Sequence, residues 1–120
     1  MRGLYLSVAI LSVMASDDSP SFSIEVSEEA GSVTVTAIGE IDVATAPQVE
    51  RQLLEPIDAG KAVTLDLHGV SFIDSSGLRA LVTARQRAEE TAVAFTLAGR
   101  SPAVERLLQV TGLDGVFDTQ

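Results

Sequence analysis

The sequence predicts a single α/β domain on a mixed, mostly parallel sheet of about five strands, with helices mainly on one face. Two observations support this fold class. Short runs of alternating apolar and polar residues recur along the chain, and the longer segments between them carry apolar residues at helical spacing. An order of strand, helix and strand requires right-handed crossovers onto parallel strands. Because three helices are too few to cover both faces of such a sheet, one face should be partly polar.

Five segments have the pattern of strands, and the first two flank turn-forming residues, which predicts an antiparallel hairpin at one edge. The strands are expected at residues 22–26, 33–38, 62–67 and 92–98, with a short terminal strand around residues 116–117. Successive side chains of a strand point to opposite faces. The polar residues expected on the uncovered face are Thr34, Thr36, Thr64, Asp66 and Thr96.

Three segments have the pattern of amphipathic helices. They are expected to begin near Thr45, Leu78 and Ser101 and to end near Gly60, Arg87 and Gly112. The first and third carry a proline in the first turn, where a missing backbone N–H is tolerated. Both are followed by glycine, the residue that most often ends a helix. These signals support the placement of both helices.

The composition limits the classes of partner. The 120 residues carry a formal net charge of −9, no Cys, no Trp and one Tyr. Nucleic acid and anionic membranes would be repelled by such a chain, and it lacks aromatic platforms for bases, so we expect neither nucleic-acid binding nor direct membrane binding. A basic protein partner would be attracted. Without cysteine there is no disulfide or thiolate metal site, which is compatible with a reducing cytoplasm.

Residues 1–19 are expected to form an N-terminal extension to a domain that spans residues 20–118. The apolar run at residues 4–15 has the composition of a signal peptide but is too short to span a bilayer. Export would make the chain a secreted interaction domain. Met14 opens an ordinary polar segment, which favours the alternative that translation starts there and that residues 1–13 are upstream sequence. We therefore expect a cytoplasmic protein.

The stretch formed by Asp74, Ser75, Ser76 and Gly77 lies where an apolar strand ends and a helix begins. The start of a helix leaves about four backbone N–H groups without intrahelical partners, and Asp and Ser are the side chains that cap them. One polar side chain is enough for a cap, so a hydroxyl can remain exposed at a helix end that favours anions. The stretch therefore predicts a phosphorylatable switch.

Asp42 and Asp74 both follow strands of the parallel part of the sheet, at the edge where open α/β sheets bind their ligands. Two carboxylates at one edge could hold a magnesium ion, or each could cap the helix that follows it. We favour capping, because the free N–H groups of a helix start already explain an aspartate at these positions. No metal site is therefore expected.

Signals for catalysis are weak. His68 is the only histidine, so a Ser-His-Asp arrangement would have to use it, and we expect it instead to be a polar residue at the end of its strand. The chain has no glycine-rich phosphate loop, no dinucleotide fingerprint and no nucleophile elbow around its serines. An esterase is accordingly a remote alternative, and no catalytic residue is predicted.

Several segments together resemble the STAS domain of bacterial anti-sigma factor antagonists. They are residues 39–42 with Ala46 and Pro47, residues 65–67, residues 70–78, and residues 104–113 with Phe117. The resemblance covers residues 20–118. Its most specific part is the Asp-Ser-Ser-Gly element. Four residues alone would be a weak signal, but their position at the end of an apolar strand in this architecture makes the resemblance specific.

The resemblance implies a binding module and not an enzyme. In this family the unphosphorylated antagonist binds an anti-sigma factor that is itself a serine kinase, which releases the sigma factor, and a metal-dependent serine phosphatase reverses the modification. Ser75 matches the phosphorylated serine, and Asp42, Asp74, Ser76 and Gly77 are expected to share its partner-binding surface. ATP and Mg²⁺ would belong to the kinase, so the chain itself would need no cofactor.

One departure from the family pattern and one alternative function stay open. Arg79 stands where many relatives carry a small residue, which leaves the identity of the cognate kinase in doubt. The alternative is a STAS accessory subunit of a membrane lipid or anion transporter, in which the same surface docks on the transporter and the serine is structural. Phosphorylation by a kinase partner would separate the two.

Overall fold

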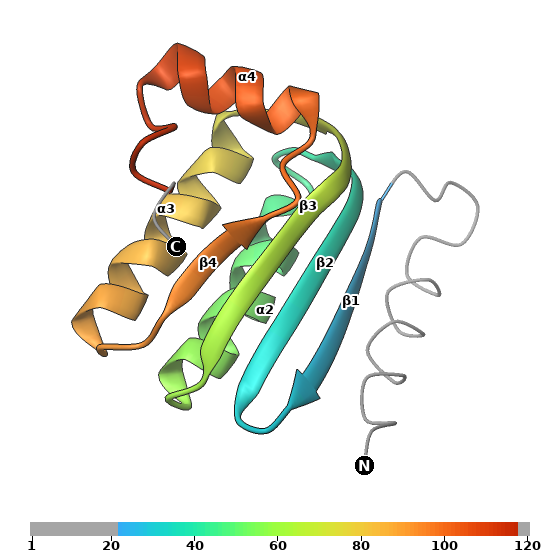
Figure 1. The fold of residues 1–120 in the computed structure, drawn as a ribbon. Helices are drawn as coiled ribbons and strands as arrows, with labels where there is room; N and C mark the ends of the chain where they lie inside the picture. The colour runs from blue at the N-terminus through green and yellow to red at the C-terminus, as the bar shows by residue number, and fades with distance from the viewer. Residues whose placement is uncertain (1–21, 118–120) are drawn as a thin grey trace.

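The computed structural model describes residues 22–117, which form four strands and three helices (Figure 1). Their order is β1 (Phe22–Glu29), β2 (Ser32–Ile41), α2 (Ala46–Asp58), β3 (Ala62–Ile73), α3 (Ser75–Glu90), β4 (Phe95–Ala98) and α4 (Pro102–Thr111). Helices α2 and α3 lie against one face of the sheet, and α4 crosses the end at which β2 and β3 finish. The predicted α/β class and the one-sided helix cover are confirmed. The expectations for residues 1–19 lie outside the described part.

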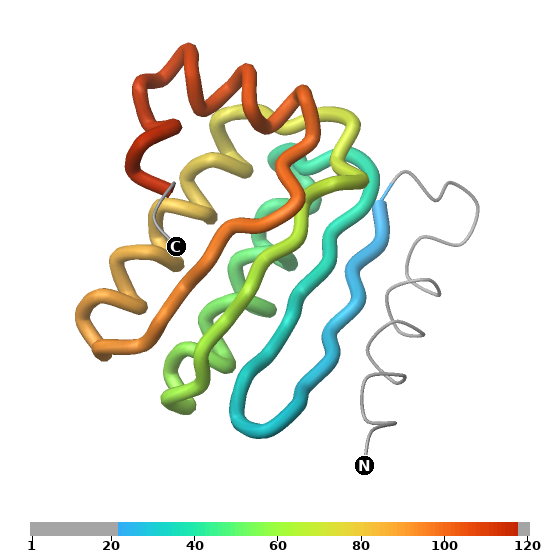
Figure 2. Tube along the Cα trace, in the orientation of Figure 1, coloured from blue at the N-terminus to red at the C-terminus, as the bar shows by residue number. Residues whose placement is uncertain are grey.

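The sheet has the strand order β1-β2-β3-β4. Strand β1 pairs antiparallel with β2, while β2, β3 and β4 are parallel, so the sheet is mixed and mostly parallel as expected. Each parallel step passes through a helix, α2 and then α3, as the path of the chain in Figure 2 shows. The ends of β2 and β3 and the starts of α2 and α3 therefore meet at one edge of the sheet.

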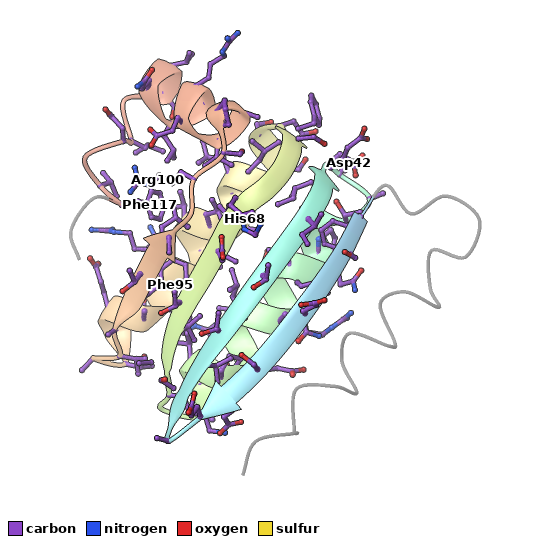
Figure 3. All side chains as sticks on the ribbon, turned by 45° about the vertical axis from the view of Figure 1, so that its right-hand side comes forward. Asp42, His68, Phe95, Arg100 and Phe117 are labelled. Carbon is purple, nitrogen blue, oxygen red and sulfur yellow. The ribbon has the colours of Figure 1, made fainter. Side chains whose placement is uncertain are left out.

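Strand β3 continues to Ile73, beyond the predicted end at residue 67. The second half was missed because the pairing of β3 with β2 shifts register twice. Each shift adds one residue on β3, so its buried residues Leu67, Val70 and Ile73 are three apart instead of two. The alternation from which a strand is recognised is lost after Leu67. His68 consequently lies inside the strand, exposed on the face away from α2, and not at the strand's end as predicted (Figure 3).

The two faces of the sheet differ as predicted. The inward residues of the strands form one aliphatic core with fully buried residues of α2, which are Val49, Leu53 and Ile57, and of α3, which include Leu81 and Ala84. On the opposite face, Thr34, Thr64 and Thr96 occupy neighbouring positions across β2, β3 and β4. The polar row faces away from the helices, because strand side chains alternate between the faces.

The predicted terminal strand around residues 116–117 is wrong. Residues 114–117 form a turn, and the ring of Phe117 is buried in the core cluster. The guanidinium of Arg100 donates a hydrogen bond to the Phe117 carbonyl oxygen, which holds this turn close to the end of β4 (Figure 3). The apolar pair at residues 116–117 thus reflects burial of a turn and not pairing in the sheet.

Candidate functional site

Two loops meet at the edge where β2 and β3 end. Ile41 and Ile73 are paired in the parallel ladder, and each is followed directly by an aspartate, Asp42 or Asp74. The backbone N–H of Asp74 donates to the carbonyl oxygen of Ile41 over 3.2 Å, which ties the second loop to the first. The expected proximity of the two aspartate loops is therefore a property of the fold.

Asp74 caps helix α3. Its Oδ1 accepts hydrogen bonds from the backbone N–H of Ser76 at 2.8 Å and of Gly77 at 3.3 Å, and its backbone is extended, as in an N-cap residue. Because the carboxylate satisfies these amides, no serine hydroxyl is needed for capping. Ser75 is exposed at the first position of α3, and its hydroxyl makes no hydrogen bond within residues 22–117. Ser76 is half-buried.

Gly77 is buried where the first turn of α3 lies against the sheet. A Cβ atom at this position would lie 2.7 Å from both Ile41 Cγ2 and Ile73 Cγ1, closer than van der Waals contact allows. A larger residue would push the start of α3 away from the sheet. Gly77 is therefore a buried residue that sets where the first turn of α3, and with it Ser75, stands.

Asp42 organises the loop between β2 and α2. Its Oδ1 accepts from the backbone N–H of Ala44 at 3.0 Å and of Thr45 at 3.2 Å. The Thr45 hydroxyl donates to the Glu40 carbonyl oxygen at 3.0 Å and accepts from the Asp42 N–H at 2.9 Å. Thr45, and not Asp42, is the residue before α2, so Asp42 shapes the turn ahead of the helix. The turn leaves the side chain of Val43 74% exposed.

The geometry explains both aspartates without a metal ion. Each carboxylate accepts hydrogen bonds from backbone amides of its own loop. In the part of the chain from 22 to 117, no three side chains of His, Asp or Glu are placed to hold a cation together. The His68 Nδ1 lies 2.9 Å from Asp66 Oδ1 on the open face of the sheet, whereas Ser75 starts a helix on the covered face. The structure does not bring these side chains together as a Ser-His-Asp arrangement.

Ser75 and Ser76 open onto a groove of about 810 Å³ between α2 and α3. The groove is lined by Val43, Ala46, Pro47, Glu50, Arg51, Leu54, Glu55, Asp58, Ser75, Ser76 and Arg79. Asp58 is held by Arg87 of α3, whose Nη1 lies 2.6 Å from Asp58 Oδ1. The Asp58 carboxylate raises the pKa of the Arg87 guanidinium, first through the hydrogen bond and then through its charge. The acid is thus neutralised within the groove wall.

The contribution of α2 to this groove was not anticipated from the sequence. Pro47, Arg51, Leu54 and Asp58 recur three or four residues apart along α2, which puts them on one side of the helix. That spacing was the available signal. The buried stripe of the same helix, which includes Leu53, dominates its sequence pattern and hides this second spacing.

A second, smaller groove of about 450 Å³ lies between the end of β3 and α4. Its walls include Phe72 and Val110, whose side chains are 48% and 77% exposed. The second register shift in β3 turns Phe72 outward, and Val110 lies on the outer side of α4. Exposed apolar side chains therefore gather at the same end of the molecule as Ser75.

Comparison with known proteins gives a consistent result. The family model described as the STAS domain matches residues 22–120. The anti-sigma-B factor antagonist of Listeria monocytogenes is 32% identical over 100 residues, covering 82% of this chain and 88% of that protein. The anti-sigma-F factor antagonist RsfB of Mycobacterium tuberculosis is 30% identical over 98 residues, covering 81% of this chain and 80% of that protein.

Solved structures agree with this result. The crystal structure of an anti-sigma factor antagonist from Mycobacterium paratuberculosis superposes with a TM-score of 0.72 at 31% identity, covering 82% of this chain and 84% of that one. Sequence and three-dimensional fold thus point to one family, and the family model accounts for all of the residues that the structure describes. The chain belongs to the STAS domain family.

Proposed function

We propose that this protein is an anti-sigma factor antagonist, a regulatory binding module whose unphosphorylated form occupies an anti-sigma factor and so frees a sigma factor. The relatives that bear this name align over four fifths of the chain. The observation that carries the proposal is the exposed hydroxyl of Ser75, which Asp74 leaves free by capping α3 itself. A hydroxyl in this state is accessible to a partner and to a kinase.

The proposed switch is phosphorylation of Ser75 by the anti-sigma factor, acting as a serine kinase. The Ser75 Oγ forms a bond to the γ-phosphorus of ATP, the bond from that phosphorus to the β,γ-bridging oxygen breaks, and ADP leaves. The hydroxyl proton passes to a base of the kinase. A metal-dependent serine phosphatase returns the free hydroxyl by hydrolysis. ATP and Mg²⁺ belong to the partners, and the use of ATP places the protein in the cytoplasm.

Phosphorylation should act at the interface and leave the fold intact. A phosphate adds about −1.5 to −2 charges at a helix start, where negative charge is tolerated. The Asp74 cap uses backbone amides and does not involve the Ser75 hydroxyl, so it survives the modification. A dianion in a contact surface where the anti-sigma factor offers it no counter-charge weakens binding by a few kcal/mol, about a hundredfold or more in affinity.

Asp42, Ser76 and Val43 are the further residues that we assign to the binding surface. Val43 supplies exposed apolar area beside the serine groove, which a protein partner can desolvate. Asp42 holds the loop that presents Val43. No helix within residues 22–117 is long and apolar enough to cross a membrane. A docking role on a transporter remains the outcome expected if no kinase uses Ser75.

Phosphopeptide mapping tests the proposal. The full chain is incubated with its cognate anti-sigma factor and labelled ATP, together with the variants Ser75→Ala and Ser76→Ala. We expect one phosphate on Ser75, full labelling of Ser76→Ala and none of Ser75→Ala. Ser76→Ala is the matched control, because it removes the neighbouring hydroxyl, which lines the same groove. Phosphate on Ser76 alone would contradict the assignment.

A further inference from the structure

Most basic side chains of the described part are already engaged. Lys61 pairs with Glu28, Arg85 with Glu89 and Arg87 with Asp58, while Arg100 donates to the Phe117 carbonyl oxygen. Three arginines have no carboxylate within ion-pair distance among residues 22–117, and these are Arg51, Arg79 and Arg106. Two of the three, Arg51 and Arg79, line the groove onto which Ser75 opens. Cations that have no ion pair within the described residues are thus concentrated beside the serine of an acidic chain.

Arg79 is placed to reach Ser75 along helix α3. The two residues are four apart, so their Cβ atoms lie on one side of the helix about one turn from each other. Side chains of a helix lean towards its N-terminus, which directs Arg79 back to the first turn where Ser75 stands. An acidic group placed N-terminal to a basic one at this spacing is the more favourable order. Arg51 faces the same groove from α2.

We propose that Arg79, assisted by Arg51, binds the phosphate of phosphorylated Ser75 within the same chain. This inference rests on the proposed function only in taking Ser75 as the modified residue. The planar guanidinium of arginine presents paired N–H donors that match phosphate oxygens, and such charge-assisted hydrogen bonds are about twice as strong as neutral ones. The amino end of α3 adds a weaker attraction for the same charge.

Acidic side chains near the serine oppose this binding, and several of them already have partners. Asp58 is paired with Arg87, and the carboxylates of Asp42 and Asp74 accept hydrogen bonds from their own loops. Glu50 and Glu55 also line the groove, so their charges act on the phosphate from α2. A carboxylate has no hydrogen to donate to a phosphate and can only repel it by charge, whereas a guanidinium can donate hydrogen bonds to it as well.

The binding changes what the phosphate does to the partner. In the unphosphorylated protein, Arg51 and Arg79 are exposed cations beside Ser75. When the phosphate is bound in cis, both cations are neutralised and turned towards the chain's own helix. Phosphorylation would therefore add negative charge and at the same time withdraw two positive contacts from the interface. The switch would be sharper than repulsion alone provides.

A ³¹P NMR titration of the full chain with phosphoserine incorporated at position 75 during translation tests this proposal without any kinase. We expect the second pKa of the phosphate, ordinarily about 6, to be lower in the otherwise wild-type protein than in Arg79→Gln by about 0.3–0.7 units. Arg51→Gln should raise this pKa by less. Arg79→Lys keeps the charge without the planar donors, so its phosphate pKa should lie between those of the wild type and Arg79→Gln. Arg106→Gln is the matched control, since it removes an unpaired arginine that lines the other groove.

Equal phosphate pKa values in wild type, Arg79→Gln and Arg106→Gln would overturn the proposal. An equal rise in Arg79→Gln and Arg106→Gln would overturn it as well, because net charge and not contact would then be responsible. Since the phosphoserine is installed genetically, these outcomes do not depend on whether an anti-sigma factor phosphorylates Ser75. Failure of the phosphopeptide mapping and failure of the titration are therefore separate results.

Discussion

The two loops that end β2 and β3 start from the same pattern and build different surfaces. In both, a buried isoleucine of the ladder is followed by an aspartate, Asp42 or Asp74, whose carboxylate accepts from two backbone amides. After Asp74 the helix begins at once, so the next residue, Ser75, is its first position. After Asp42 the chain makes a turn of three residues before α2 begins at Ala46. The number of residues between the aspartate and the start of the helix therefore decides which side chain each loop exposes.

Aspartate thus serves two different junctions. At the β3–α3 junction, Gly77 allows the helix to pack closely on the sheet and Asp74 caps the helix. The junction exposes one hydroxyl, that of Ser75, in a fixed position. The β2–α2 loop is held by Asp42 and Thr45 and offers an apolar side chain, Val43. We regard the first as the switch and the second as contact area. Substitutions in the two loops should separate these roles.

The largest effect on stability is expected from Gly77→Ala. The added Cβ meets two isoleucine side chains at 2.7 Å, and overpacking of this kind typically costs about 1–3 kcal/mol. Since 1 kcal/mol shifts Tm by about 4–8 °C in a domain of this size, a thermal melt should show a clear decrease. Gly115→Ala is the matched control, because no atom lies within 4 Å of its added Cβ. Equal Tm values for the two variants would mean that α3 does not need the close approach.

A smaller decrease is expected from Asp74→Ala. Loss of an N-cap acceptor costs about 0.5–2 kcal/mol, and the amides of Ser76 and Gly77 would lose their partner. Asp74→Asn keeps a side-chain oxygen for these amides and should retain most of the stability. The check is a pair of chemical denaturation curves. Stability of Asp74→Ala equal to that of wild type would show that a serine replaces the cap.

Asp42→Ala should lower the free energy of unfolding less than Asp74→Ala does, and its main effect should be on phosphorylation by the anti-sigma factor. The Thr45 hydroxyl still joins the loop to Glu40, so the change in Tm should be only a few degrees. The loop that presents Val43 would lose two amide contacts, and phosphorylation by the anti-sigma factor should become slower. Initial rates of labelling and a thermal melt, compared with those of Asp42→Asn, check this. Complete unfolding of Asp42→Ala would make the residue purely structural.

The smallest effect on stability is expected from Val43→Ser. The side chain is 74% exposed, and such surface changes usually stay within about 0.5 kcal/mol. Binding of the anti-sigma factor should nevertheless weaken by about 1 kcal/mol or more, which is roughly five- to tenfold, if Val43 is part of the buried contact. Val110→Ser, at a residue 77% exposed on α4, is the control and should bind as wild type does. Unchanged binding by Val43→Ser would remove this loop from the interface.

Local signals predicted much of the fold. The hairpin and the three helices follow from the spacing of apolar residues and from the turn residues, proline and glycine that bound them. The third helix begins where expected, and the Ser101 hydroxyl accepts from the Val104 N–H at 3.3 Å. The end of β3 was missed because two register shifts, set by pairing with β2, break the alternation. The burial of Phe117 was mistaken for a strand because packing and pairing both favour an apolar residue.

The candidate site divides in the same way. Capping chemistry predicted that one polar residue of the Asp-Ser-Ser-Gly stretch would be spent on the helix, and the structure shows that Asp74 is the one. The groove beside Ser75 could not be predicted, because Arg51 and Arg79 are brought together only when α2 packs beside α3. Contacts within one turn of the chain are encoded locally, whereas contacts between helices depend on the completed sheet.

We propose that the state of Ser75 decides whether the anti-sigma factor is bound. The most direct measurement is a calorimetric titration of the cognate anti-sigma factor with the full chain, unmodified and with phosphoserine incorporated at position 75. We predict tight binding of the unmodified protein and a loss of about a hundredfold or more in affinity on phosphorylation, which corresponds to about 2.7 kcal/mol or more. Equal affinity of the two forms would contradict the account.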